Sequence, residues 1–472
     1  MPIPCPSQRL PLIVALVPLL LAGCISGPDY QKPEVISPPG WGWKLAEPHD
    51  QVIKDDWWQL FNDPLLNKLE TQATAASPLL QTAVARVDQA RAQAGIASSH
   101  FFPQLAFDPS VSRFHTQKNH VPSNLTATAT TLPLDLSYEV DLWGKIRRSL
   151  EAAHAQAESN VASYYQVLLT LHGDVASNYF LLRQLDTQIT LLERTQDLRQ
   201  KGTLIVEERF HAGMAPELDL DRALTEFAQT KTLVIETQRQ RAHLQDAIAL
   251  LCGQPAPSFH IAPGALPETL PKIPSGLPSQ LLERRPDVAE AERKMAAANA
   301  QIGVAKAAFF PALSLTGNAG YSSFHTSSLL DWQSQLFQLG PSVALPILNG
   351  GRIKAGVQEA RAAYQAACGN YQQQVLTAFK DVSDALVDLD SYHQQGATEG
   401  EALTSAQRAA GSSRERYGQG LVNYLDVLDA ERTQLQTELQ TTQILASRLI
   451  ATIHLVKALG GGFDQRSWKK QG

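Results

Sequence analysis

The chain has 472 residues, of which 44% are apolar and 18% are charged, and its formal net charge at pH 7 is −6. This is the composition of a globular protein, and the absence of a basic excess in the sequence argues against nucleic acid as a partner. A mean hydropathy of −0.17 excludes a protein built from many membrane helices, whereas membrane β-strands, which alternate apolar and polar residues, would escape this test.

The N-terminus has the pattern of a secretion signal. Arg9 precedes the apolar run 10–21, which is too short to cross a bilayer as a helix. The run ends in Leu-Ala-Gly-Cys, which resembles a bacterial lipobox with Cys24 as the acylated residue. We therefore expect residues 1–23 to be a lipoprotein signal peptide and Cys24 to carry N-palmitoyl and S-diacylglycerol groups. An ordinary signal peptide that happens to contain this cysteine is the alternative. In the lipoprotein pattern, Ile25 at the next position implies release to the outer membrane.

The segment after the signal is rich in Pro, Gly and Trp, so residues 24–63 are expected to run extended, anchored by the lipid. A first helix is predicted from Pro64. It breaks at Ser77 and Pro78, because Ser is a good N-cap and Pro suits the first helical position. Its stripe of small apolar residues is typical of closely packed, coiled-coil-like helices. The helix is expected to end before Pro103.

The sequence period then changes from that of a helix to that of a strand. Over residues 132–142 apolar and polar residues alternate, and this run has about the length of a tilted transmembrane strand. With a weaker alternation upstream it predicts a β-hairpin at about 103–143, and a second hairpin is predicted at about 311–349. Alternation alone does not distinguish a membrane barrel from a sandwich, so a soluble amphipathic hairpin is the alternative.

Each hairpin is followed by a very long helical pattern, at roughly 144–201 and 351–411. At 1.5 Å per residue, such a helix would reach about 85 Å, which exceeds the size of a compact domain. A turn that contains Gly213 or Gly420 follows, and a returning helix of about 35 residues comes next, ending at a further glycine.

The chain is a tandem duplication. Residues 209–219 and 416–426 share the pattern Arg-aromatic-x-x-Gly-x-x-x-x-Leu-Asp at an offset of 207 residues, and the same offset relates Gly253 to Gly460. The seven prolines of residues 255–278 predict an extended linker between the two repeats. The expected order is a signal peptide (1–23), an extended segment (24–63), a first repeat (64–254), a linker (255–278), a second repeat (279–462) and a tail (463–472).

The number of strands limits the architecture. Four strands per chain leave open edges, for which lipid offers no hydrogen-bond partner, and closed membrane barrels begin at about eight strands. A cyclic oligomer is therefore needed, and the polar faces of the long helices weakly favour three chains over two. The expected fold class is mainly α with a membrane β portion. In it, a long α-helical coiled-coil barrel joins four transmembrane β-strands per chain, and a trimer closes a 12-stranded β-barrel.

Several motifs in a fixed order extend along the chain between Cys24 and Gly462. They are Asp-Trp-Trp-Gln-Leu-Phe-Asn-Asp-Pro at 56–64, Ala-Val-Ala-Arg-Val at 83–87 with Phe102-Pro103, Gly-Leu-Pro-Ser-Gln-Leu-Leu-Glu-Arg-Arg-Pro-Asp at 276–287, Ala-Ala-Asn-Ala-Gln-Ile-Gly at 297–303, and Tyr-Leu-Asp-Val-Leu-Asp-Ala at 424–430. Together they resemble the TolC-type outer-membrane efflux channels, in the nodulation-protein-T lipoprotein branch. The resemblance implies a homotrimer in the bacterial outer membrane whose tunnel extends into the periplasm. It also implies export of small molecules such as drugs and toxic compounds, together with a periplasmic adaptor protein and an inner-membrane pump of the RND or a similar type.

The resemblance places Asp426 and Asp429 at the narrow periplasmic mouth of the tunnel. Spaced i and i+3, they share one helix face, and in a trimer they would form two stacked carboxylate rings that prefer cations. Tyr417 and Arg416 match family positions whose contacts hold the mouth shut. The alternative is that both aspartates only complement the dipole of a helix that Asn423 caps.

The repeat alignment adds two candidate gate partners in the first repeat. Asp426 matches Asp219, whereas Asp429 matches Arg222, so the two turns differ in charge. An Arg222–Asp429 latch is a hypothesis that follows from this difference. A basic residue that some relatives place five positions after the gate tyrosine is replaced here by Val422, so their particular lock does not transfer.

The sequence carries no metal-type His spacing, no nucleophile elbow and no phosphate-binding loop, so we expect no enzyme and no cofactor apart from the lipid. Cys252 and Cys368 are interpreted as small apolar fillers. Two other functions stay open. One is an outer-membrane channel for type I protein secretion. The other is a structural periplasmic lipoprotein whose hairpins never enter the bilayer, although a coiled coil has no need of paired amphipathic strands.

Overall fold

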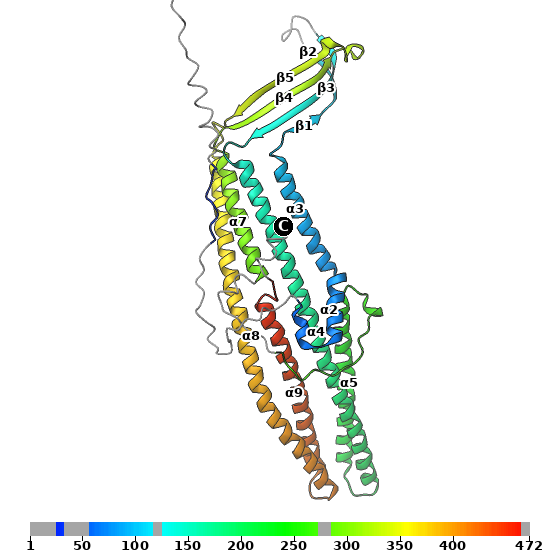
Figure 1. Ribbon diagram of the computed structural model, residues 1–472. Helices are drawn as coiled ribbons and strands as arrows, with labels where there is room; N and C mark the ends of the chain where they lie inside the picture. The colour runs from blue at the N-terminus through cyan, green and yellow to red at the C-terminus, as the bar shows by residue number, and fades with distance from the viewer. Residues whose placement is uncertain (1–24, 33–55, 117–124, 272–284, 464–472) are drawn as a thin grey trace, which may run out of the picture. The chain divides into compact units, whose positions relative to one another are not determined.

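The computed structural model describes residues 25–32, 56–116, 125–271 and 285–463 (Figure 1). The signal peptide and Cys24 lie outside these residues. The chain divides into two compact units. The sheet unit comprises Met1–Glu34, Arg86–Val161 and Glu290–Gln372, and the turn unit comprises Val35–Ala85, Ala162–Ala289 and Gln373–Gly472.

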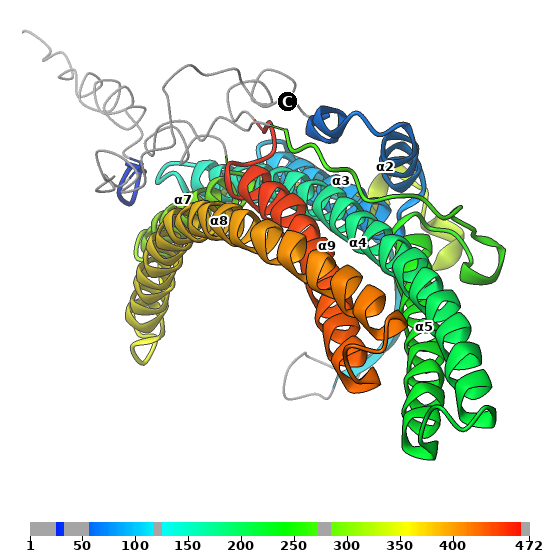
Figure 2. The same cartoon turned by 90° about the horizontal axis from the view of Figure 1, so that it is seen from below.

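Two pairs of long helices repeat along the chain. Helices α4 (Lys145–His211) and α8 (Arg352–Gly418) have 67 residues each, and α5 (Glu217–Leu251) and α9 (Tyr424–Ala458) have 35 residues each. Corresponding helices begin 207 residues apart, which is the offset of the sequence repeat. In the turn unit α5 returns beside α4 and α9 beside α8 (Figures 1 and 2). Across the described ranges, no helix is both long enough and apolar enough to span a membrane.

The long helices end later than the sequence pattern predicted. Glycines near the predicted ends, Gly202 and Gly411, lie inside α4 and α8 with open space around them. A glycine in a helix interior costs only about 1 kcal/mol relative to alanine, so it does not by itself stop a packed helix. The helices stop where Gly213 (φ 69°) and Gly420 (φ 74°) adopt the left-handed conformation.

Helices α2 (Pro64–Ala76) and α3 (Pro78–Ser99) follow the predicted order, whereas a 3-10 turn lies at the end of residues 24–63, which were expected to be extended. This 3-10 turn, η1 (Trp57–Phe61), precedes α2, and the predicted break at Ser77 separates α2 from α3. The Asp63 carboxylate caps α2 by accepting hydrogen bonds from the next helical N–H groups, at 2.9 and 3.1 Å. The structured ranges also contain α7 (Pro286–Ala307) and the short 3-10 turns η2 (Ala256–Ser258), η3 (Thr326–Ser328) and η4 (Trp332–Ser334).

The strands of the two repeats form one antiparallel sheet rather than two separate hairpins. Its segments are β1 (Gln104–Phe107), β2 (Ser110–Thr116), β3 (Leu125–Val140), β4 (Ala312–Ser323) and β5 (Gln335–Ala344). Both β1 and β2 pair with β3, so they occupy one strand position, and the order is β1/β2, β3, β4, β5 (Figure 1). The four expected strand positions are present. The pairing of β3 with β4, which joins the repeats, was not predicted.

The register collects apolar side chains on one face of this sheet. Leu105 lies opposite Leu136, Leu136 opposite Gly317, and Gly317 opposite Leu339, and directly opposite residues share a face. In the chain this face is exposed to a large extent, for example by 79% at Phe337. The other face carries polar pairs such as Asn318 donating to Asp135 at 2.5 Å. The apolar face also includes Phe107, Leu132, Leu134, Tyr138, Val140, Leu313, Leu315, Ala319, Tyr321 and Val343.

The main core of the turn unit lies where η1 and α2 pack on α4, α5 and α9. Its largest members are Trp57, Leu66, Tyr179, Phe180, Leu182, Ile248, Leu449 and Ile453. Cys252 belongs to this core and is fully buried, as predicted, whereas Cys368 is only half-buried and is therefore no core filler.

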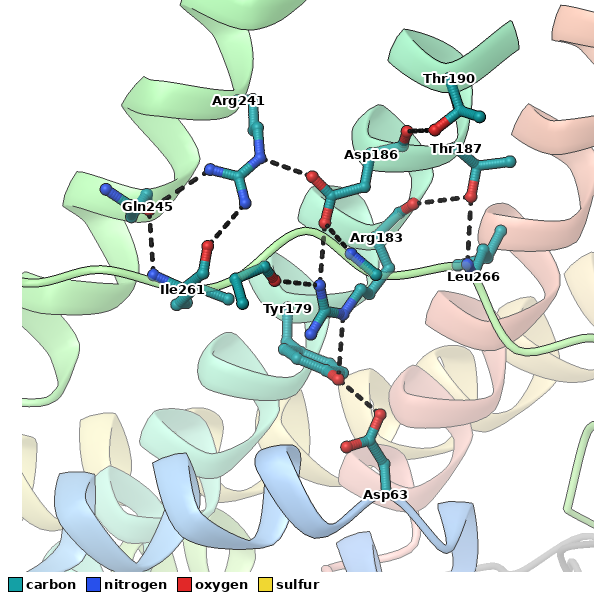
Figure 3. A network of polar contacts seen from close by, with 12 residues as sticks. Asp63, Tyr179, Arg183, Asp186, Thr187, Thr190, Arg241, Gln245, Ile261 and Leu266 are labelled. Atoms are coloured by element: carbon teal, nitrogen blue, oxygen red, sulfur yellow. Dashed lines mark hydrogen bonds and ion pairs between the residues drawn. The ribbon is translucent and has the colours of Figure 1, made fainter.

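A buried polar network attaches the linker between the repeats to the first helix pair (Figure 3). Asp186 of α4 accepts hydrogen bonds from Arg183 at 2.8 Å and from Arg241 of α5 at 2.5 Å. Arg183 also donates to the Tyr179 hydroxyl, which donates to Asp63 at 2.5 Å. Burial and this hydrogen bond to Asp63 raise the pKa of Tyr179. Asp63, which belongs to the Asp-Trp-Trp motif at 56–64, is thus part of the same network.

Backbone atoms of the extended linker complete that network. Arg241 donates to the Ile261 carbonyl and Arg183 to the Ala262 carbonyl, both at 2.8 Å, and the Gly264 N–H donates to Asp186 at 3.0 Å. Because every charged group here has a buried partner, the linker is held along a defined path, where the sequence predicted only an extended chain.

Candidate functional site

The repeated Arg-aromatic-x-x-Gly pattern builds two helix ends of the same kind. The N–H of Met214 donates to the Arg209 carbonyl at 2.8 Å, and the N–H of Leu421 donates to the Arg416 carbonyl at 2.9 Å. These bonds close a Schellman turn, in which the glycine adopts a positive φ at almost no cost. The motif therefore specifies the backbone of both turns.

A small apolar cluster ties the two turns together within the turn unit. Tyr417 packs beside Tyr424, with ring centroids 5.4 Å apart, and the Arg209 guanidinium lies 4.7 Å from the Tyr417 ring centroid. Burial, followed by the negative charge of Glu431, raises the pKa of Tyr424 to about 12. The cluster consists of Val206, Ala223, Tyr424, Val427 and Leu428, with Leu220 and Tyr417 packed against it.

Arg209, which the sequence reasoning did not single out, thus contacts the predicted gate tyrosine. It is the repeat counterpart of Arg416, and this correspondence was the available signal. Arg416 itself lies exposed in the last turn of α8, where a cation complements the helix dipole.

The two aspartates at the start of α9 have different surroundings. Asp426 accepts a hydrogen bond from the backbone N–H of Asn423 at 3.0 Å, which is a capping arrangement. Asp429 is 71% exposed, and its Oδ1 lies 4.0 Å from Nη1 of Arg432. The capping interpretation therefore accounts for Asp426 and leaves Asp429 unexplained.

The candidate partners in the first repeat pair with each other. Nη1 of Arg222 lies 3.4 Å from Oδ1 of Asp219, and these side chains are 37% and 17% exposed. Among the described residues Arg222 therefore pairs with Asp219 rather than with Asp429.

A buried carboxylate behind the second turn was missed in the sequence. Glu226 of α5 is 3% exposed and lies between two arginines from other helices. Its Oε2 lies 2.9 Å from Nη1 of Arg199 in α4, and its Oε1 accepts from Nε of Arg432 in α9 at 2.8 Å. The available signal was its spacing from Ala223 and Thr230, which places it on the buried stripe of α5. Over the ranges described, no three His, Cys, Asp or Glu side chains are grouped to hold a metal ion.

The chain is similar to outer-membrane efflux proteins throughout its length. A family model described as outer membrane efflux protein matches residues 69–254 and 277–461, one segment in each repeat. The cation efflux system protein CusC of Escherichia coli strain K12 is 31% identical over 469 residues, which cover 97% of this chain and 100% of that protein. The outer membrane protein OprJ of Pseudomonas aeruginosa is 30% identical over 456 residues, which cover 95% of each.

A solved structure agrees with these sequence matches. The crystal structure of the CmeC outer membrane channel of Campylobacter jejuni superposes with a TM-score of 0.89 at 26% identity, covering 95% of this chain and 98% of that one.

Proposed function

This chain belongs to the outer membrane efflux protein family and is an outer-membrane channel of an efflux system, and we propose that three copies of it close one 12-stranded barrel. The observation that carries the proposal is the sheet, whose apolar face crosses all four strand positions and whose edges, β1/β2 and β5, have no partner strand among the described residues. Lipid cannot satisfy the backbone groups of such edges, so strands of neighbouring copies must do so.

We further propose that Asp429 and Asp426 line the mouth of the tunnel, with Tyr417 and Arg416 helping to keep it closed. The exposure of Asp429 supports this role, because a carboxylate that neither caps a helix nor sits in a tight ion pair is available to passing ions. Tyr417 contacts Tyr424, the first residue of α9, and Arg209 at the end of α4, and can therefore hold the two turns in register.

A lipid anchor on Cys24 is part of the proposal. Residues 25–32, which follow it, are held firmly in the sheet unit. The N–H of Ser26 donates to the Trp143 carbonyl at 3.0 Å, and Asp29 pairs with the buried Arg148 at 2.6 Å. A Cβ on Gly303 would lie 2.7 Å from the Ser26 carbonyl oxygen. The glycine that ends the motif at 297–303 therefore leaves space for residues 25–32. Lipid on Cys24 would enter the bilayer close to the end of β3.

The proposed partners are a periplasmic adaptor protein and an inner-membrane pump of the RND or a similar type, with small molecules as cargo. CusC belongs by its printed name to a cation efflux system, and export of cations is one case of this function. The secretion alternative has no observation in its favour, and family membership sets the structural lipoprotein aside.

The native mass of the protein extracted in mild detergent from outer-membrane fractions tests the shared barrel, and the N-terminal peptide of the same sample tests the anchor. We expect a trimer whose mature chain begins at an acylated Cys24. A monomer would leave the sheet edges unpaired and contradict the barrel. A trimer with an unmodified N-terminus would remove the lipid anchor alone.

A further inference from the structure

The arginine next to the proposed gate carboxylate has two possible partners. Arg432 lies one helical turn after Asp429 on α9, and Nη1 and Oδ1 of the two side chains are 4.0 Å apart. Its Nε donates to Oε1 of Glu226 at 2.8 Å, and its Nη2 contacts the same oxygen. The guanidinium therefore gives its hydrogen bonds to the buried carboxylate and makes only a 4.0 Å ion pair with the exposed one.

Burial decides which partner holds the arginine. The Glu226 side chain is 3% exposed, whereas the Asp429 side chain is 71% exposed. A charge-assisted hydrogen bond to a buried carboxylate is much stronger than an exposed i,i+3 ion pair, which water and salt screen. Hydrogen bonding to Glu226 is also the main reason why the pKa of Arg432 is raised. Arg199 stays on the other side of Glu226, where it donates to Thr230 and to the Glu226 carbonyl.

We propose that Glu226 sets the ion selectivity of the mouth by taking the hydrogen bonds of Arg432, which Asp429 would otherwise accept. The proposal rests on the proposed gate, since it assumes that Asp429 faces the permeating ions. With Glu226 in place, each Asp429 carboxylate accepts no hydrogen bond from Arg432, which lies 4.0 Å away, and so favours cations. Without it, Arg432 turns to the only carboxylate left on its helix face within reach, because an acid three residues before a base is a favourable helical pair.

Arg199, Glu226 and Arg432, which we call the Glu226 clamp, border open space. Arg199, Glu226 and Arg432 line a groove of about 340 Å³ together with Gln436 and Gln440 of α9. The Arg432 side chain is 52% exposed, so about half of its surface already faces solvent.

The test is the K⁺/Cl⁻ permeability ratio of the purified full-length channel in planar bilayers under a KCl gradient. For Glu226→Gln we expect a fall of about twofold or more, because an arginine then neutralises each ring carboxylate. The double variant Glu226→Gln/Arg432→Gln is expected to regain the wild-type ratio. An unchanged ratio in the single variant, or a double variant as low as the single one, overturns the proposal.

Matched controls separate this mechanism from a general loss of charge. Glu438→Gln removes a different buried carboxylate, which lies on α9 and away from Asp429. Gln434 and Arg194 contact it at 2.9 and 3.4 Å. We expect the ratio of this variant to stay at the wild-type value, and an equal fall would show a field effect and overturn the clamp. If Glu226→Gln does not assemble, Glu226→Asp makes the same test, since it keeps a counterion for Arg199 but shortens the reach to Arg432.

Asp429→Asn distinguishes failure of this inference from failure of the proposed gate. If Asp429→Asn lowers the ratio and Glu226→Gln does not, the gate stands and the clamp is wrong. If neither substitution lowers it, Asp429 does not face the ions, and the gate falls together with the inference.

Discussion

The turn after α4 and the turn after α8 share one backbone but differ in charge. Both place a glycine at positive φ, at 69° and 74°, and both close with the same hydrogen bond to an arginine carbonyl. In the first turn Asp219 is 17% exposed and paired with Arg222, whereas in the second Asp429 is 71% exposed and Arg432 is drawn to Glu226. Both copies thus share the shape of the turn, while the pairing of their charged side chains differs.

The Glu226 clamp is the feature in which the two repeats differ most. At the repeat offset Glu226 corresponds to Thr433, and its partner Arg199 corresponds to Ala406. This set of residues therefore occurs in one repeat only, and it joins both helices of the first pair to α9 of the second.

Removing the buried carboxylate is expected to have the largest effect on stability. Glu226→Ala leaves Arg199 buried without its counterion, which typically costs about 3–5 kcal/mol. We expect a marked fall in the midpoint of denaturant unfolding in detergent. The repeat counterpart Thr433 is exposed, so Thr433→Ala should change the free energy of unfolding by no more than about 0.5 kcal/mol. Equal shifts would mean that the clamp contributes nothing.

Substituting the turn glycines tests the shared backbone. A Cβ at Gly213 or Gly420 would meet no atom within 4 Å, so only the left-handed conformation penalises a side chain there. Alanine at either position should lower the free energy of unfolding by about 1–2 kcal/mol, and the loss should be the same in both turns. The measurement is again the unfolding midpoint, and a large difference between the two variants would contradict the equivalence of the turns.

The contact between the turns is expected to be weaker. Arg209→Ala removes the guanidinium from the Tyr417 ring and should cost about 0.5–1 kcal/mol, as exposed cation–π contacts do. Arg209→Lys keeps the cation and serves as the control. If the lysine and alanine variants lost the same stability, the contribution would come from the planar guanidinium and not from its charge.

The last expected effect appears only at high pH and concerns the second turn. The folded-state pKa of Tyr424 is raised to about 12, whereas Glu217 occupies its counterpart position. The unfolded chain releases the phenol proton near pH 10, so this contribution to stability is complete below pH 10 and is lost as the pH rises toward about 12. Tyr424→Phe should make the fall in stability over this interval less steep. An unchanged slope would show that the hydroxyl does not titrate there.

Local signals explain what the sequence predicted. Glycine caps, the Ser77-Pro78 break and the period of two in residues 132–142 are properties of neighbouring residues, so the helix pairs and the strand positions could be predicted. The pairing of β3 with β4 could not be, because it depends on the register between segments of different repeats. Glu226 was missed because one glutamate in a polar helix is usually solvated. Only the packing of α4 and α9 on α5 makes it a buried counterion.

The most direct test of the contrast between the turns is the K⁺/Cl⁻ permeability ratio of two neutralised channels. One carries Asp426→Asn and Asp429→Asn in the second turn. The other carries Asp219→Asn and Arg222→Gln in the first turn, which leaves the net charge unchanged. Our account predicts a clear loss of cation preference in the former and a wild-type ratio in the latter. An equal loss in both channels, or no loss in the former, would contradict the claim that the second turn alone forms the selective mouth.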